Sequence, residues 1–476
     1  MTLRISVDFS LTRRAFLGRH AGAIGSLALA HLAAAEGGRD KPGRSLDPLL
    51  PKTPHHPAKA KAVICLFQHG GPSQMDLFDP KPELTKQHGK PHPDKLETHF
   101  HTQTGKLLAS PFKFLKCGKS GVELSELLPH TGKIVDNITL VRSMTTESVD
   151  HEAALRMIHS GKVFAGRPAW GSWVLYGLGT ERQNLPAYVV LSDPGGLPVD
   201  GPNNWSSGFL PAVYQGTPFR ASGTPVTYLA TPSDLPAAAR TNQLDLLGGL
   251  NAAHLRQHAK NAELEARTRH FELAAQMQTA VPEVLDLSKE TDETKKLYGL
   301  DDPKCGEYAK RCLMARRLIE RGVRFVQIFL SSQPWDTHSK NAESLKNLTA
   351  MTDRPSAALV LDLKQRGLLD STIVLWTGEF GRLPISQGAD GRDHNRHAFS
   401  LWIAGGGFKK GYVHGATDDF GYKSVEKVVR VPHLHATLLH ALGLNHEKLT
   451  FPHEGRDDSL TDVAVSGAEI VPELLG

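Results

Sequence analysis

Cysteine is scarce in this sequence, with four among 476 residues. Cys305 and Cys312 lie seven residues apart in a helical pattern, which separates them by roughly 10 Å along a helix axis and puts them beyond disulfide reach. Cys65 lies inside a run of residues typical of a buried strand. The pattern excludes a disulfide framework and a cysteine zinc cluster, and it indicates core fillers or free thiols.

Blocks of positive charge are also missing. The formal net charge is +5 at pH 7, and four arginines against one aspartate within the first 35 residues account for much of it. Beyond that point no run of lysine and arginine is long enough to indicate nucleic-acid binding. We therefore expect no nucleic-acid partner.

The apolar run near the N-terminus is too short to span a membrane comfortably. It extends from Ala21 to Ala35 and includes His31. It follows Thr12-Arg13-Arg14-Ala15-Phe16-Leu17-Gly18 and ends in small residues before Glu36. This arrangement resembles a twin-arginine export signal over residues 1–35. It implies export to the periplasm or cell envelope with no integral membrane domain, an uncleaved anchor being the alternative.

Two common catalytic motifs are absent. Gly405-Gly406-Gly407 follows an expected strand but lacks the lysine and Ser/Thr of a nucleotide-binding loop. No Gly-x-Ser-x-Gly elbow occurs, which argues against a serine hydrolase.

What the sequence does contain is an alternation of strands and helices. Residues 36–60 have the composition of a linker. After them, strands are expected at 62–67, 138–141, 188–191, 323–330, 372–376 and 399–404, with amphipathic helices at 307–321 and 356–365. Unbroken apolar strands alternating with helices predict an α/β fold with a mostly parallel central sheet and helices on both faces. Residues 239–299 are helical and charged in pattern, and we interpret them as a helical insertion or cap.

Polar side chains flank most of these strands. They are His69 and Asp76, Arg142 and His151, Asp336 and His338, Glu379 and Arg382, and, just before the strand at 399–404, Asp393 and His394. A parallel sheet brings strand ends to one edge, where ligands collect. Each residue alone has an ordinary explanation as a helix cap or turn former, so the prediction rests on their convergence. Carboxylates with imidazoles suit one or two divalent ions, such as zinc, manganese or calcium.

Four segments resemble the DUF1501 family of exported bacterial proteins. They are His69 to Pro82, Thr377 to Arg382, Gly391 to Asn395 and Gly455 to Asp457. The resemblance covers about residues 58 to 475, and the family is placed near the alkaline phosphatase and sulfatase superfamily. It implies an alkaline phosphatase-like domain over residues 61–476.

The resemblance also implies ligand roles. Asp336 and His338 match a ligand pair after a central strand, and His394 completes the same metal site. His69, with Asp76 as support or substitute, and Glu379 would form a second site. Phe380 stands where phosphatases have a ligating histidine, and it cannot ligate.

The position of the nucleophile departs from the superfamily pattern. Counting back from Gly161 along the expected helix puts His151 where sulfatase-like proteins have Cys, Ser or Thr. An imidazole there could bind metal, accept a phosphoryl group or act as a base. Thr145, Thr146 and Ser148 are hydroxyl alternatives upstream.

The function expected is that of a metal-dependent hydrolase of phosphate or sulfate esters, with an anionic ester or a sulfated or phosphorylated glycan as substrate. Arg382 or Arg142 would balance the anionic charge, because a planar guanidinium suits tetrahedral oxyanions. The alternative is a catalytically degenerate, metal-containing binding protein of the cell envelope. The departure at His151 and the loss of a ligand at Phe380 favour this alternative.

Overall fold

The structure is a computed structural model that describes residues 48–100, 104–181, 184–220, 226, 236–258 and 262–476. These residues belong to one compact unit, Pro48–Gly476. The expected signal peptide at 1–35 and the linker up to residue 47 lie outside them. No helix within these ranges is long and apolar enough to cross a membrane.

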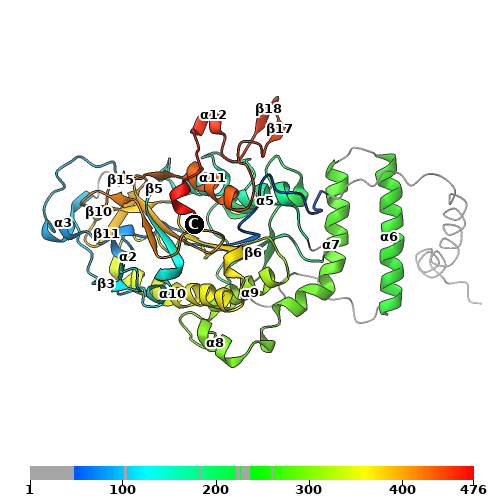
Figure 1. Cartoon of the computed structure of the whole chain (residues 1–476), viewed down its shortest axis with the longest axis horizontal. Helices are drawn as coiled ribbons and strands as arrows, with labels where there is room; N and C mark the ends of the chain where they lie inside the picture. Colours follow the sequence, from blue (N-terminus) through cyan, green and yellow to red (C-terminus); the bar gives the residue numbers. More distant parts are fainter. Residues whose placement is uncertain (1–47, 101–103, 182–183, 221–225, 227–235, 259–261) are drawn as a thin grey trace, which may run out of the picture. The chain divides into compact units, whose positions relative to one another are not determined.

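A nine-stranded sheet forms the centre of this unit (Figure 1). Its order is β13 (Tyr412–His414), β5 (Ile138–Thr145), β12 (Phe399–Ala404), β9 (Thr372–Thr377), β1 (Ala62–Phe67), β8 (Phe325–Ile328), β6 (Tyr188–Leu191) and β7 (Thr217–Phe219), with β16 (Val429–Arg430) beside β5. Every neighbouring pair is parallel except the two pairs that β12 makes. The predicted α/β fold with a mostly parallel sheet is confirmed.

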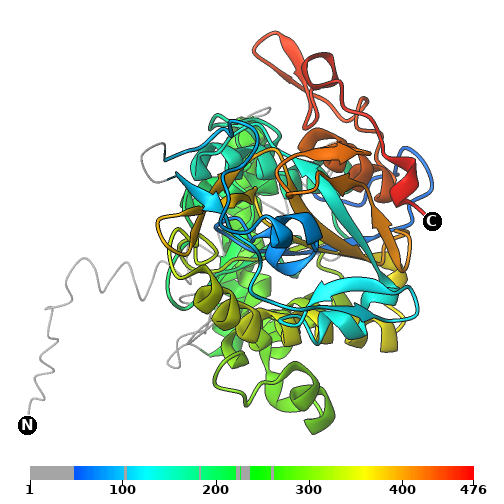
Figure 2. The same cartoon turned by 90° about the vertical axis from the view of Figure 1, so that its left-hand side faces the viewer.

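Helices cover both faces of this sheet. One face carries α9 (Gly306–Glu320) and α10 (Asn341–Gln365), and the other carries α4 (His151–Ser160), α5 (Trp170–Leu178) and α11 (Val431–Ala441). In β1, Ile64 and Leu66 pack against the first set, whereas Val63, Cys65 and Phe67 pack against the second. Figure 2 shows the strands enclosed between the two helical layers. Since side chains alternate along a strand and both faces of β1 are buried, this strand is apolar throughout.

The reversed strand β12 has a direct consequence for the site. Because β12 runs antiparallel to β5 and β9, its first residues lie at the edge where those two strands end. The hydrogen bond from the Thr146 N–H to the Arg396 carbonyl, 3.0 Å, joins the two ends there. A fully parallel sheet would have put residues 391–395 at the opposite edge.

A small antiparallel sheet lies beside this edge. It consists of β2 (Thr104–Leu107), β10 (Gly381–Gln387) and β11 (Gly391–Asn395). Arg392 in β11 pairs with Asp76 in α2 (Gln74–Leu77), with Nε 2.7 Å from Oδ2 and Nη2 3.1 Å from Oδ1, and both side chains are fully buried. This pair fastens the small sheet to the segment that follows β1.

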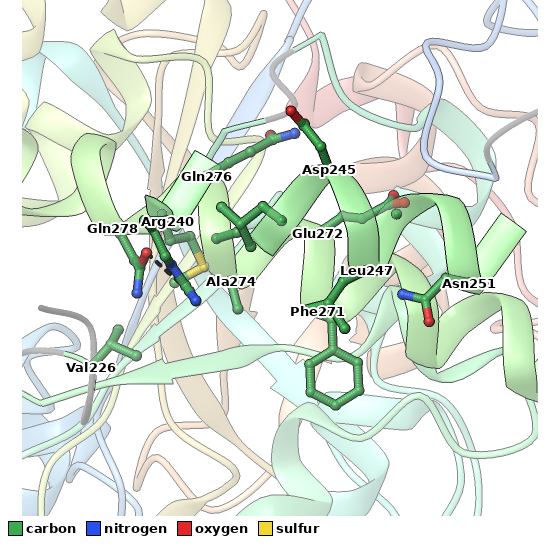
Figure 3. A pocket seen from close by; sticks show the side chains of 14 residues that line it. Val226, Arg240, Asp245, Leu247, Asn251, Phe271, Glu272, Ala274, Gln276 and Gln278 are labelled. Carbon is green, nitrogen blue, oxygen red and sulfur yellow. Dashed lines mark hydrogen bonds between the residues drawn. The ribbon is translucent and has the colours of Figure 1, made fainter. Parts of the chain in front are cut away.

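Residues 237–298 are largely helical. They contain α6 (Ala237–Gln257), α7 (Ala262–Leu285) and α8 (Asp292–Tyr298). Between α6 and α7 lies a hollow of about 650 Å³ (Figure 3), lined by residues such as Arg240, Leu247 and Phe271. None of the predicted site residues lines this hollow, and the interpretation of the segment as an insertion or cap stays a prediction.

The remaining elements are short. They are α3 (Pro82–Lys86), β3 (Phe114–Cys117), β4 (Val122–Ser125), β14 (Ala416–Thr417), β15 (Ser424–Glu426), β17 (Phe451–His453), β18 (Arg456–Asp458) and α12 (Val463–Ser466).

The buried pair between Asp76 and Arg392 yields a stability prediction. Replacing Asp76 by Ala leaves a guanidinium buried without its counter-charge, so the free energy of unfolding should fall by roughly 3–5 kcal/mol. Glu83→Ala removes a partly exposed carboxylate, 3.4 Å from Lys86, and serves as the control that changes stability little. Urea denaturation measures both, and equal stabilities of the two variants would contradict the prediction.

Candidate metal centre

Six of the predicted residues come together at the edge of the sheet. They are His69 after β1, His151 at the start of α4, Asp336 and His338 after β8, Glu379 after β9 and His394 in β11. Contacts among them link each residue to the group. The fold therefore joins segments more than 300 residues apart, since His69 and His394 are 325 positions apart in the sequence.

Three ligand atoms in this group form a triangle. Asp336 Oδ1 lies 2.9 Å from His338 Nε2 and 3.1 Å from His394 Nε2, and the two imidazole nitrogens lie 2.9 Å apart. The other nitrogen of His394 is held by the Val149 carbonyl at 2.6 Å, and that of His338 by the Gln387 side chain. Both rings thus present Nε2 to the same carboxylate oxygen.

His151 and Glu379 form a buried dyad beside the triangle. His151 Nδ1 lies 2.7 Å from Glu379 Oε1, and the Gly70 N–H donates to the same oxygen at 2.9 Å. His151 Nε2 points toward Asp336 Oδ2 at 3.4 Å, close enough for an ion pair but outside hydrogen-bond geometry. Gly70 has φ +114°, and a Cβ there would lie 2.5 Å from the Asp336 nitrogen, so only glycine allows this close approach.

His69 is the most unusual member of the group. Its side chain is fully buried, and neither ring nitrogen has a hydrogen-bond partner. Its ring centroid lies 6.4 Å from that of His151. A buried polar group without a partner destabilises a fold, so these two nitrogens are candidate ligand atoms.

The histidines differ in their affinity for protons. Burial lowers the pKa of His69 to about 4, against the opposing charge of Glu379, and burial likewise lowers that of His394 to about 4. For His151 burial also acts downward, but contacts with Asp336 and Glu379 outweigh it and raise the pKa to about 9. The Asp336 carboxyl has a pKa far below its usual range, because contacts with three histidines outweigh burial.

Arg382 belongs to the scaffold of the centre. It is fully buried and donates to the carbonyls of Gly71 and Arg392 and, at 2.6 Å, to Asp336 Oδ1. Its donors are engaged by the protein, and one of them holds Asp336, whereas its contact with a substrate stays a prediction.

Three other predicted residues have separate partners. The Asp76 carboxylate accepts hydrogen bonds from Arg392, Ser73 and Asn341. Arg142 lies on β5, and its Nε is 3.8 Å from Asp79 Oδ1. Asp393 lies next to His394, where Oδ2 accepts the N–H groups of His99 and Phe100 at 2.8 and 2.9 Å. The structure does not bring Asp76 or Arg142 into the centre, and it engages Asp393 in holding a neighbouring segment.

Sequence reasoning missed His99, Phe100 and Gln387. The His99 ring stacks on His394 with centroids 4.9 Å apart, and Phe100 approaches His338 edge-on at 5.1 Å. None of the three follows an apolar strand run of the large sheet, so the strand-end pattern carried no signal for them.

Two of the hydroxyl alternatives to His151, Thr146 and Ser148, make no hydrogen bond to an imidazole among the described residues. The Thr146 hydroxyl is buried without a partner, and Ser148 Oγ accepts the Asp150 N–H at 3.0 Å. His151 itself is the first residue of α4, with Asp150 as the N-cap. The predicted position of His151 at a helix start is therefore correct.

The residues present fit a divalent cation. His151, Asp336 and His394 offer ligand atoms within 4.8 Å of one another, and so do His338, Asp393 and His394. Imidazole and carboxylate are ligands for zinc and manganese, and the bare nitrogens of His69 extend the set. The centre therefore offers candidate ligands for a metal ion.

Proton binding at the centre predicts a pH dependence of stability in the metal-free chain. His151 has a folded pKa of about 9 against about 6.5 in the unfolded chain. The protonated His151 therefore contributes fully to the free energy of unfolding below pH about 6.5, and this contribution is lost as the pH rises through about 9. The difference in unfolding free energy between wild type and His151→Gln should shrink over this window, as measured by urea denaturation with a chelator. A difference that grows toward pH 9 would refute the assignment.

Solved structures provide remote likenesses. A sulfatase from Pseudoalteromonas sp. is 12% identical, with 96% of this chain and 80% of that chain covered and a TM-score of 0.34. An alkaline phosphatase from the Antarctic bacterium TAB5 is 11% identical, with 82% of this chain and 99% of that chain covered and a TM-score of 0.33. A protein in the alkaline phosphatase superfamily from Vibrio parahaemolyticus is 9% identical, with 89% of this chain and 77% of that chain covered and a TM-score of 0.34.

A search of curated proteins found no match. A family model does match, over residues 60–475, and its description is "Protein of unknown function (DUF1501)". Since the match covers most of the chain, it confirms the resemblance found in the motifs: the chain belongs to the DUF1501 family.

Proposed function

We propose that this protein is a metal-dependent hydrolase of phosphate or sulfate esters. The observation that carries the proposal is the convergence of four histidines and two carboxylates from five segments, and one of these histidines, His69, has two buried nitrogens without a partner. Such a cluster costs stability unless something compensates its charges and polar atoms. One or two divalent ions, such as zinc, manganese or calcium, would compensate them.

Asp336, His338 and His394 would hold the first ion, and His69 would contribute to a second. When bound, such an ion polarises the ester and lowers the pKa of a water molecule, so that the water can attack. Arg382 fixes the Asp336 carboxylate through a 2.6 Å hydrogen bond, and Val149 and Gln387 fix the two imidazoles. These contacts orient the ligands before the substrate arrives.

His151 would handle the proton. With Nδ1 held by Glu379, its Nε2 faces the triangle, where it can hold a proton and donate it to the oxygen of the leaving group. Glu379 is held by the Gly70 N–H, so it orients His151 in turn. Arg382 already pairs with Asp336, and Arg142 already pairs with Asp79. The positive charge that balances the anionic ester would therefore come from the ion and from His151.

An anionic ester, or a sulfated or phosphorylated glycan, is the substrate class that this chemistry suits. Export through the twin-arginine pathway to the periplasm or cell envelope is part of the proposal and rests on residues 12–36. It is consistent with loading of the ion into an already folded chain.

A second candidate function is a metal-containing binding protein that does not turn over its ligand. It is favoured by His151, which stands in place of a hydroxyl or thiol nucleophile and is held between two carboxylates. The same centre would then bind an anionic group without cleaving it.

Elemental analysis of the purified protein tests both functions. We expect near-stoichiometric metal in the wild type, and its loss, with loss of turnover on aryl phosphate or aryl sulfate, in Asp336→Ala/His338→Ala. His433→Ala, a histidine in α11 outside the cluster, is the control that keeps the metal.

Metal without turnover of either ester would favour the binding protein. A wild type without metal, even after reloading with zinc, manganese and calcium, would overturn the proposal.

A further inference from the structure

Two aromatic rings that the proposed reaction does not use lie against the metal-site histidines. The His99 ring stacks on His394 at 4.9 Å with an interplanar angle of 21°, and Phe100 meets His338 edge-on at 5.1 Å and His394 at 6.4 Å. Phe100 is nevertheless 41% exposed. A large apolar ring thus lies partly open to solvent beside a cluster of charged and polar groups.

The segment that carries these rings is fastened to the centre. Asp393 Oδ2 accepts both backbone N–H groups, from His99 and Phe100, while Asp393 Oδ1 accepts the N–H of His394. One carboxylate, only 4% exposed, therefore connects the rings with the neighbouring ligand. The strand that carries His394 therefore also holds the backbone of Phe100 in position, through Asp393.

The segment is fastened a second time just before these residues. Glu97 Oε2 accepts from Arg396 Nε at 2.9 Å and lies 2.7 Å from His397 Nε2, and the Glu97 N–H donates to the Tyr422 hydroxyl at 3.1 Å. A segment held at two points loses little freedom when a ligand binds, which favours affinity.

We propose that Phe100, supported by His99, is a specificity-determining residue that packs against the organic part of the ester. The occupant is the flat apolar face of a six-membered ring, whether an aryl group or a pyranose, attached to the oxyanion. Binding pockets combine such aromatic walls with a few polar groups that fix orientation. This inference rests on the proposed function, because the oxyanion must first be held at the metal centre.

The test is calorimetric titration of the full-length, metal-loaded protein with methylphosphonate and phenylphosphonate, which share the oxyanion and differ in the ring. We expect the wild type to bind phenylphosphonate more tightly than methylphosphonate. Phe100→Ala should raise the Kd of phenylphosphonate about 3- to 10-fold and leave the Kd of methylphosphonate unchanged. Phe100→Trp retains a ring and should retain the preference. A pyranosyl phosphonate in place of phenylphosphonate distinguishes a sugar ring from an aryl ring.

Phe271→Ala is the matched control, since Phe271 is an exposed phenylalanine, 63% exposed, on α7 in the hollow of Figure 3. It should change neither Kd. Equal weakening of both ligands by Phe100→Ala, or no preference for phenylphosphonate in the wild type, overturns the role of Phe100 and leaves the proposed function standing. A metal-loaded wild type that binds neither phosphonate overturns the proposed function and this inference with it.

Discussion

The Asp336 carboxylate is the point on which the centre depends. Its Oδ1 is within 3.1 Å of Arg382, His338 and His394, and its Oδ2 faces His151. A partly buried charge of this kind is tolerated only if opposite charges and donors surround it. The ring of groups around Asp336 meets this requirement, and the same ring supplies the chemistry of the site.

This arrangement requires segments from distant parts of the chain to meet within a few ångströms. The parallel strands β1, β8 and β9 deliver His69, Asp336 and Glu379 to one edge. The antiparallel strand β12 then makes it possible for β11, which precedes it, to add His394 from the same side. The buried pair of Asp76 and Arg392 holds β11 in place. Asp76, which the sequence offered as a candidate ligand, thus belongs to the frame of the centre.

Much of the fold could be predicted from local pattern. The strands at 62–67, 188–191 and 399–404 have the same bounds in the structure, because fully buried strands consist of short apolar runs between turn residues. The helix expected at 356–365 is the last part of α10, which begins at Asn341 and continues through Pro355. Pro355 concealed the earlier turns, since proline in a helix interior usually marks a boundary.

The sequence predicted which residues form the site better than it predicted what each residue does there. Parallel strands bring their carboxyl ends to one edge of a sheet, which is why His69, Asp336, His338 and Glu379 met as expected. Arg382, Arg142 and Asp76 show the limit, since a guanidinium or carboxylate at a strand end binds whichever partner the packing brings within reach. Phe100 had no strand-end signal at all.

The sequence by itself determined the class of fold and which residue types stand at the ends of its strands, because apolar periodicity and turn chemistry are local properties of the chain. The tertiary structure decided which of those side chains face one another, which arginines are consumed by the scaffold and which rings line the centre. These outcomes depend on the direction of β12 and on contacts between residues more than 300 positions apart, such as Asp76 and Arg392, which no local pattern encodes.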